Sequence, residues 1–508
     1  MVRVLRMPSS GATTVLVKYW LYLTGRVGCI VCSASSRESK FAVLSHHRMG
    51  FLIMAAEVNT PKPGNRLSPS DLWLLVLLFL VPLIGYIHRL ILNILIDPVS
   101  QELVLTDTQA SFLQGPPFAL AYGLMVIPMG LLVDRRKRLV LIGVGALVWS
   151  TGTLFCGFAS DSSELFLARV IVGVGEAALT PAAVSLVGDA FEGHRRGLAM
   201  GVFFTGVNAG FSSAYAVGGV TLEFAEAGYF AALPWIGELA PWRQVFCVIS
   251  LPGFLIPLLM LTLREPIGEV PTSTSESSSL RTLFRHPGFP RVLILLIAIA
   301  SILAVADNGI YAWLPRLLSR LYTLQPSEIG VSLGIVVAIG GLVGGPVGGK
   351  LSDYFSRQLG TAGPLLVVLL GTLLALVSVP LFVSDVLALV YVGTGFWVVA
   401  IVATTTSVFT FVAVAAPPQL RGASSSIVTA AMALIGLGLG PTTIAVALEQ
   451  FNFARERVDL AILVSVLPLC LVVVTLAFIV LRLHRRSTSL VPISAREQYT
   501  DNNVSIER

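Results

Sequence analysis

The chain is a succession of long apolar runs separated by short polar stretches. Twelve runs are long enough to cross a bilayer, since about 20 apolar residues span its hydrocarbon core as a helix. The runs are continuous rather than alternating, which favours helices over the strands of a membrane barrel. We therefore predict an all-α membrane protein with spans at about 72–96, 109–133, 139–158, 165–188, 198–220, 243–263, 292–315, 329–350, 362–383, 386–414, 423–447 and 460–481.

The composition agrees with this prediction. Hydrophobic residues make up 55% of the 508 residues and charged residues only 12%, about half the charged share of a soluble domain. The net charge of +6 does not indicate nucleic acid as a partner, because basic residues of membrane proteins gather in cytoplasmic loops. The five cysteines are scattered, and the isolated Cys29-x-x-Cys32 pair lacks the further ligands of a metal site. We expect the lipid bilayer as a partner, and no metal or other cofactor.

Most Lys and Arg residues between the spans fall on one side of the predicted membrane. These are in the loops at 134–138, 195–196, 264–291, 350–357, 421 and 482–486. The opposite loops carry acidic residues and fewer basic ones. The distribution predicts that both termini are cytoplasmic, in an integral protein of the plasma or inner membrane.

A segment rich in Ser, Thr and Pro at 264–291 divides the spans six and six. Such a composition is typical of a linker. We expect an N-terminal six-helix bundle at 71–263, a cytoplasmic linker at 264–291, a C-terminal six-helix bundle at 292–482 and a cytoplasmic tail at 483–508.

Residues 1–70 form an extension that differs from the rest of the chain. Up to Ala56 its only acidic residue is Glu38, as in a targeting peptide. The alternative is a start site placed too early, with the true one at Met49 or Met54. We expect this extension to be disordered or to lie upstream of the true start, and we expect no thirteenth span in it.

The two halves share short signatures at matched positions. Gly130-x-Leu-x-Asp134 ends the second span and Gly349-x-Leu-x-Asp353 ends the eighth. Arg196-Gly197 opens the fifth span and Arg421-Gly422 the eleventh. Matched loops in two six-span halves indicate duplication, as in transporters that rock one half against the other.

These motifs carry a resemblance to a known family. The stretch "GLLVDRRKRLV" resembles the G-x-L-x-D-R-x-x-R loop of the major facilitator superfamily. The stretches "RVIVGVGEAALTP" and "YAWLPRLLSRLYTLQPSEIG" are similar to elements of its spinster-like branch. The resemblance covers about 70–485 and implies two pseudo-symmetric bundles, with spans 1, 4, 7 and 10 lining a central cavity. It also implies a protein that works as a monomer.

The same resemblance implies a cytoplasmic gate. In the outward-open state, Asp134 would pair with basic residues and with the end of a neighbouring helix. Asp353 and Arg357 would do the same in the second half. The alternative is a stop signal that needs no Asp. The residues we assign to this gate are Gly130, Asp134, Arg135, Arg138, Asp189, Arg196, Gly349, Asp353, Arg357 and Arg421.

Charged side chains inside the spans are candidates for solute binding and coupling, because a charge at a helix centre costs at least about 2.5–3.5 kcal/mol. Arg169 and Glu176 lie about two turns apart on one helix face. A Glu176 that exchanges partners would bind and release a proton, whereas a permanent pair with Arg89 or Arg169 would only hold helices together. The candidates are His88, Arg89, Asn93, Arg169, Glu176, Asp307 and Tyr311.

Two of these candidates have alternative roles. Arg89 could bind an anionic headgroup, since guanidinium suits carboxylate and phosphate. The resemblance implies an acid immediately before this Arg, as spinster-like proteins commonly carry, and here His88 occupies that place. His88 would therefore titrate in its stead, or remain neutral and hydrogen-bonded.

We therefore expect a secondary active transporter, with a proton as candidate co-substrate in symport or antiport. Its solute would be a small amphipathic or anionic organic compound, such as a lysolipid or a sphingolipid-like one. A multidrug or metabolite exporter, or a uniporter of the same fold, is the alternative. A transceptor and a membrane-embedded enzyme are remote alternatives. We expect no enzyme, since the sequence shows no His-rich cluster and no nucleophile with its base.

Overall fold

The structure is a computed structural model. It describes residues 3–7, 13–21, 26–35, 38–44, 55–56, 68–133, 137–191, 194–265, 289–415, 421–451, 453–454 and 456–489. The chain divides into two units, Met1–Ser68 and Pro69–Arg508, and each is described by itself. The linker predicted at 264–291 falls mostly on 266–288, which lies outside the described residues.

The first unit is a small antiparallel sheet. Its strands follow the chain order β1-β2-β3-β4-β5. We predict from the sequence that this extension is disordered or lies upstream of the true start; the strands differ from the first prediction, and the second stays a prediction. Their sequences, such as "TTVLVKYWL", are rich in the β-branched and aromatic residues that suit strands. The strands are β1 (Arg3–Met7), β2 (Thr13–Leu21), β3 (Arg26–Ser35), β4 (Glu38–Leu44) and β5 (Ala55–Ala56).

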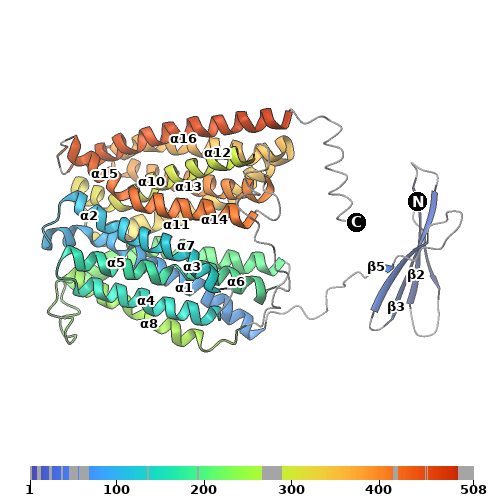
Figure 1. The fold of residues 1–508 in the computed structure, drawn as a ribbon, viewed down its shortest axis with the longest axis horizontal. Helices are drawn as coiled ribbons and strands as arrows, with labels where there is room; N and C mark the ends of the chain where they lie inside the picture. The colour runs from blue at the N-terminus through green and yellow to red at the C-terminus, as the bar shows by residue number, and fades with distance from the viewer. Residues whose placement is uncertain are drawn as a thin grey trace. The chain divides into compact units, whose positions relative to one another are not determined.

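The second unit is helical, and Figure 1 shows its first helices in blue to green along one side and the later ones in yellow to red along the other. The earlier helices are α1 (Pro69–Glu102), α2 (Asp107–Gln114), α3 (Pro116–Val133), α4 (Arg138–Phe158), α5 (Ser162–Glu176), α6 (Leu179–Ala190), α7 (His194–Glu226) and α8 (Pro241–Met260). The later ones are α10 (Phe289–Tyr322), α11 (Pro326–Leu359), η1 (Gly360–Ala362), α12 (Gly363–Ser378), η2 (Val379–Val383), α13 (Leu387–Ala415), α14 (Arg421–Ala431), η4 (Met432–Leu437), α15 (Gly438–Gln450) and α16 (Val458–Ser489).

The described helices account for the predicted spans, which confirms the fold class. Among the described residues, ten stretches are long and apolar enough to cross a membrane. One of them, Pro326–Val383, contains both α11 and α12. Helix α7 is not among the ten, but its 33 residues extend about 50 Å. These additions bring the ten stretches to the twelve spans predicted.

Three predicted spans are interrupted helices. The second breaks at Gly115, immediately before Pro116 begins α3. The fourth breaks after Glu176, because Pro181 lacks the N–H that the Ala177 carbonyl would accept from in a continuous helix. The eleventh contains the π-helical turn η4. The sequence pattern, which reports only apolar length, did not predict the breaks at Gly115 and after Glu176.

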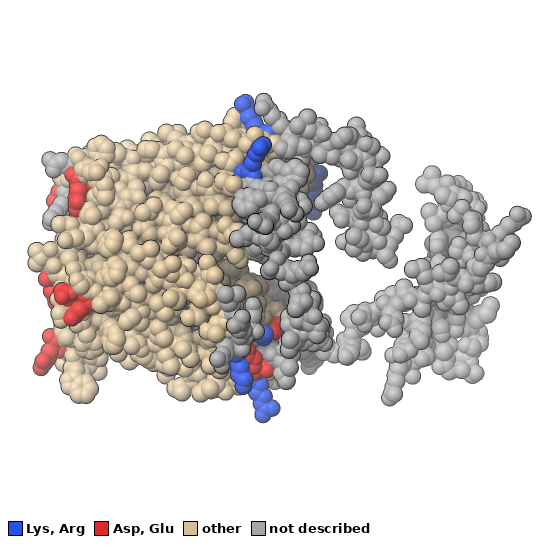
Figure 2. Space-filling model, viewed as in Figure 1, with Lys and Arg blue, Asp and Glu red and all other residues tan. Residues whose placement is uncertain are grey.

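The helical unit has two chemically different ends (Figure 2). Acidic side chains gather at one end, which we call the acidic end, and basic side chains with a few acidic ones among them at the other, which we call the basic end. Helices α1 and α10 both run from the basic end toward the acidic end. The positive-inside rule predicts that the basic end is cytoplasmic.

The two halves pack most closely near the acidic end. In α11, a Cβ added at Gly330 would overlap the Tyr215 carbonyl oxygen of α7, and one added at Gly334 would lie 2.9 Å from the Ser212 carbonyl oxygen. Small residues thus allow close helix approach here. At the basic end, a Cβ added at Gly130 or Gly349 would meet nothing within 4 Å. Close contacts between the halves therefore lie toward the acidic end, while the two glycines at the basic end have open space beside them among the described residues.

Candidate functional site

An ion pair joins α1 to α5 inside the N-terminal half. Arg89 Nη1 lies 3.3 Å from Glu176 Oε1, and the two side chains are 12% and 4% exposed. The second Glu176 oxygen is buried without a hydrogen-bond partner in the described structure. Such a half-satisfied buried carboxylate is costly, and it leaves capacity for a proton or another donor. The structure thus brings together two of the predicted site residues.

Arg169 supports this pair through the backbone. Arg169 is 2% exposed, and its Nη2 donates to the Arg89 carbonyl oxygen at 2.8 Å. The Phe118 ring lies 4.5 Å from the Arg89 guanidinium carbon and 5.7 Å from that of Arg169. An aromatic face attracts each cation. Arg169 therefore positions Arg89 and adds a second positive charge nearby.

His88 points away from this pair. Its Nδ1 lies 3.1 Å from Thr153 Oγ1 of α4, and a Cβ added at Gly253 of α8 would lie 2.8 Å from its ring carbon. The structure therefore places His88 among α1, α4 and α8 and does not bring it to Glu176. These contacts favour a role of His88 in packing α1 against α4 and α8. Its role in proton coupling stays a prediction.

Replacing His88 should mainly affect stability. We expect His88→Ala to lower the stability of the protein by about 2 kcal/mol, because it leaves a cavity and removes a buried hydrogen bond. A lower midpoint of thermal unfolding in detergent, with an unchanged pH profile of solute uptake, is the expected result. A shifted pH profile in a variant of unchanged stability would instead assign His88 to coupling.

Asp307 lies in the C-terminal half with one hydrogen bond. Trp397 Nε1 of α13 donates to its Oδ1 at 2.9 Å. Within the described part of the chain, Asp307 forms no ion pair with Lys, Arg or His. Tyr311, one turn further along α10, accepts at its carbonyl oxygen from Tyr215 Oη at 2.9 Å. Its ring also contacts Phe211 of α7, 4.6 Å between centroids.

A layer of polar contacts closes the halves against each other just beyond these residues. Gln114 Nε2 donates to Asn93 Oδ1 at 3.2 Å and to the Ala312 carbonyl oxygen at 3.3 Å. The hydrogen bond from Tyr215 to Tyr311 lies in the same layer. We call these five residues the seal. Asn93, a predicted site residue, thus joins α1 to α10 through Gln114.

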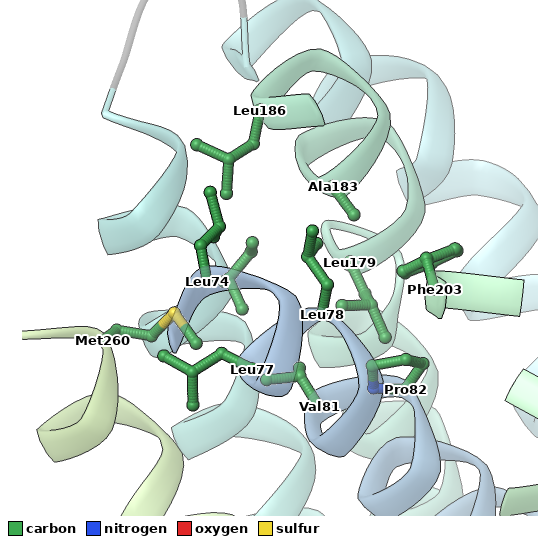
Figure 3. Close-up of a pocket in the computed structure, with 11 residues that line it drawn as sticks. Leu74, Leu77, Leu78, Val81, Pro82, Leu179, Ala183, Leu186, Phe203 and Met260 are labelled. Atoms are coloured by element: carbon green, nitrogen blue, oxygen red, sulfur yellow. The ribbon is translucent and has the colours of Figure 1, made fainter. Parts of the chain in front are cut away.

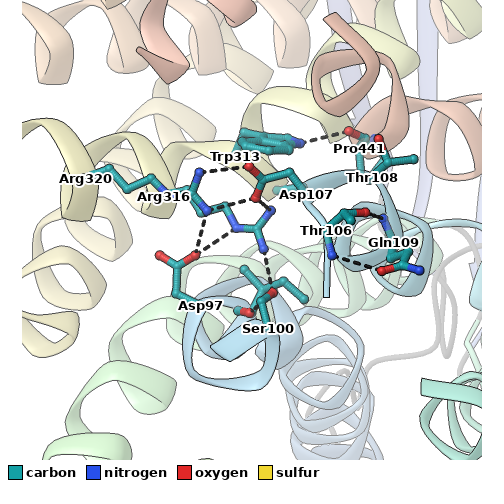
Figure 4. A network of polar contacts seen from close by, with 12 residues as sticks. Asp97, Ser100, Thr106, Asp107, Thr108, Gln109, Trp313, Arg316, Arg320 and Pro441 are labelled. Carbon is teal, nitrogen blue, oxygen red and sulfur yellow. Dashed lines mark hydrogen bonds and ion pairs between the residues drawn. The ribbon is translucent and has the colours of Figure 1, made fainter. Parts of the chain in front are cut away.

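Nearer the acidic end, a buried ion network links the halves (Figure 4). Arg316 of α10 is fully buried and lies 3.0 Å from Asp97 of α1 and 3.3 Å from Asp107 of α2. Arg320 contacts the same two carboxylates at 3.4 and 2.9 Å. Arg316 also donates to Ser100 Oγ at 3.0 Å. We call these five residues the outer network; they hold the acidic end closed.

Sequence reasoning did not assign the outer network to the site. A signal was present, because Arg316 and Arg320 are among the few basic residues of the acidic side. Their partners are separated from them by more than 200 residues along the chain, as in the hydrogen bond from Arg316 to Asp97. Only the packing of α10 against α1 and α2 brings them together.

The predicted gate residues at the basic end are only partly assembled. Arg138 NH1 lies 2.5 Å from Asp189 Oδ2, and the Arg138 N–H donates to Glu265 Oε1 at 2.6 Å. In the C-terminal half, Asp353 and Arg357 form no ion pair within the described residues. Asp134 and Arg135 lie outside the described residues, as do the side chains of Arg196 and Arg421.

An apolar crevice opens among the N-terminal helices (Figure 3). It is lined by side chains such as Leu78, Leu179, Phe203 and Met260, and its volume is about 10 Å³. This volume is about that of one water molecule, so the crevice is too small for an organic solute. Among the described residues, no group of three His, Cys, Asp or Glu side chains could hold a metal ion.

Comparisons with known proteins agree with this architecture. The family model of the Major Facilitator Superfamily matches residues 74–441. An "MFS-type efflux pump" of Mycolicibacterium smegmatis is 24% identical, over 58% of this chain and 66% of its own length. "Protein spinster" of Drosophila melanogaster is 24% identical over 63% and 52%. The chain thus spans about half to two thirds of the length of these curated relatives.

A solved structure is similar over a larger share of the chain. It is a bacterial homologue of the human lysosomal transporter Spinster in an inward-facing and occupied conformation, 25% identical to this chain. The likeness covers 84% of this chain and 98% of that one, with a TM-score of 0.69. Both bundles therefore follow the fold predicted from the sequence.

Proposed function

Because the chain belongs to the Major Facilitator Superfamily, we propose that it is a secondary active transporter that works by alternating access. The solute is a small amphipathic or anionic organic compound, and the protein acts as a monomer with a proton as candidate co-substrate. The observation that carries this proposal is the closed acidic end, with the Arg89–Glu176 pair beneath it and open space beside Gly130 and Gly349 at the basic end.

The arrangement supports one half of a transport cycle. The outer network and the seal block passage at the acidic end, while a Cβ added at Gly130 or Gly349, at the basic end, would meet nothing within 4 Å among the described residues. We propose that the basic end is cytoplasmic, with both termini on that side, in the plasma or inner membrane. The structure would then correspond to an inward-facing state. In the opposite state the outer network opens and the gate residues around Asp134 and Asp353 close.

The charged groups beneath the seal support a role in solute binding and coupling. Burying charges inside a membrane protein costs free energy, so unsatisfied ones are candidates for function. Arg89 suits an anionic headgroup, and the unpartnered oxygen of Glu176 suits a proton. The likeness to spinster proteins, one of which is a sphingosine-1-phosphate transporter of Danio rerio, favours a lipid-like amphipathic solute. The likeness to an efflux pump makes export of other organic compounds the second candidate.

Proton flux in proteoliposomes tests the proposal. The full chain is reconstituted with a pH-sensitive dye inside, and lysolipids and organic anions are added in turn. A pH change that depends on solute supports coupled transport and identifies the solute class. Equilibration of labelled solute without a pH change would indicate a uniporter. Absence of any solute movement by folded protein, across the panel, would contradict the transport function.

Glu176→Gln should uncouple solute from protons. An amide retains the shape and accepts a hydrogen bond from Arg89, but it cannot bind and release a proton. We expect solute-driven proton flux to fall at least about tenfold and uptake to lose its pH dependence. Glu164→Gln is the matched control, because Glu164 lies at the exposed start of the same helix. Full pH-dependent uptake by Glu176→Gln would show that the carboxylate is structural.

A further inference from the structure

Beneath the seal, the buried charges of the two halves are unbalanced in opposite directions. In the N-terminal half, Arg89 and Arg169 carry two positive charges beside one carboxylate, Glu176. In the C-terminal half, Asp307 is partly exposed and has no cationic partner among the described residues. A carboxylate with a single hydrogen bond inside a membrane span is stabilised by a positive charge or a proton.

Arg89 and Asp307 lie at the same depth. Arg89 precedes Asn93 by four residues in α1, and Asp307 precedes Tyr311 by four residues in α10. Both helices run from the basic end toward the acidic end, and Asn93 and Tyr311 both belong to the seal. Each charged residue is therefore about one helical turn, or roughly 5.4 Å, from the seal on the side of the basic end.

Aromatic rings connect the two charged residues. The Arg89 guanidinium carbon lies 5.2 Å from the centroid of the Tyr86 ring. Tyr86 and Phe211 have ring centroids 6.3 Å apart, and Phe211 and Tyr311 are 4.6 Å apart. A solute beneath the seal would thus meet a guanidinium on one side, a carboxylate on the other and aromatic faces between them.

We propose that Asp307 binds a protonated amine of the solute while Arg89 holds its anionic group. The preferred solutes therefore carry one negative and one positive charge, and Asp307 determines this specificity. The inference rests on the proposed transport function and names its solute class. Trp397 orients the carboxylate by its hydrogen bond to Oδ1, which leaves Oδ2 for the amine.

Two lipids that differ in a single charge test this assignment. Lysophosphatidylethanolamine carries a phosphodiester and an amine, and its N-acetyl derivative keeps the phosphodiester and the chain but loses the positive charge. We expect the full wild-type chain in detergent to bind the amine form about tenfold more tightly, as suits a charge-assisted hydrogen bond. Asp307→Asn should abolish this preference and leave the affinity for the N-acetyl form within about twofold.

Asp385→Asn is the matched control, because Asp385 is an exposed carboxylate of the same half, and it should keep the preference. Asp307→Glu should retain part of it. Equal binding of the two lipids by wild type would overturn the inference without any variant, as would binding of neither. A preference that survives in Asp307→Asn would also overturn it, because another group would then recognise the amine.

The binding measurement separates this inference from the transport proposal. A wild-type protein that shows the preference but moves no lipid into vesicles would contradict transport alone. A protein that moves lipid yet binds both forms equally would contradict the assignment of Asp307 alone.

Discussion

Arg316→Met should shift the protein strongly toward a state that is open at the acidic end. Arg316 is fully buried and contacts Asp97, Asp107 and Ser100 across the two halves. Removing one partner of a buried ion pair costs about 3–5 kcal/mol, and we expect the lower end of this range because Arg320 still contacts both carboxylates. The cost applies only while the acidic end is closed. A loss of about 3 kcal/mol corresponds to a shift of roughly a hundredfold between the two states.

Distances between spin labels would measure this shift. One pair, Val104→Cys with Val386→Cys, joins exposed positions at the acidic end of the two halves, and another, Leu198→Cys with Tyr354→Cys, does so at the basic end. Cys156, Cys247 and Cys470 are buried, and Cys29 and Cys32 would be replaced by Ser. We expect the first distance to lengthen and the second to shorten.

Arg243→Met is the control for Arg316. Arg243 also forms an ion pair at the acidic end, 2.9 Å from Glu102, but both residues belong to the N-terminal half. Its loss should lower stability without changing either distance. If Arg316→Met left both distances as in wild type, the outer network would be a passive contact rather than the closure of this end.

Two glycine substitutions in α11 should act in opposite directions. Gly330→Ala should disfavour the closed acidic end, because its Cβ would overlap the Tyr215 carbonyl oxygen. Forcing such a contact costs about 1–3 kcal/mol, or about five- to a hundredfold in the equilibrium. Gly349→Ala has free space around it in this structure. We expect it to disfavour only the state in which the basic end closes.

The same label pairs would distinguish the two variants, and Gly341→Ala provides the control. A Cβ at Gly341 would lie 3.6 Å from Asn208 Oδ1 of α7, an ordinary contact at the same helix interface. Its distances should match wild type. If Gly330→Ala and Gly349→Ala both shifted the equilibrium toward the same state, the contacts at the two ends of α11 would not close in alternation.

The fold could be predicted from the sequence because membrane spanning imposes a simple rule. A helix must stay apolar over about 20 residues, and this signal was present in each span. The breaks after Gly115 and Glu176 could not be found in the same way. They depend on single residues, Pro116 and Pro181, whose effect is local, while the apolar pattern continues across them.

The candidate site was predicted in part. The cost of a charge in the membrane singled out Arg89, Glu176 and Asp307, and the structure pairs the first two. The direction in which a side chain points was not accessible from spacing, so His88 was grouped with Arg89 although it faces α4. Long-range partners such as Asp97 and Arg316 were missed because no local pattern records which loops meet.

The break after Glu176 has a mechanical consequence. Where span 4 divides into α5 and α6, the missing N–H of Pro181 removes one restraint from the backbone at Ala177. The two pieces can then bend relative to each other at little energetic cost. The N-terminal half therefore need not tilt as one stiff block, and the segment beyond Glu176 can swing while Arg89 and Glu176 stay paired. The change in backbone conformation during transport would then occur mainly between Glu176 and Pro181.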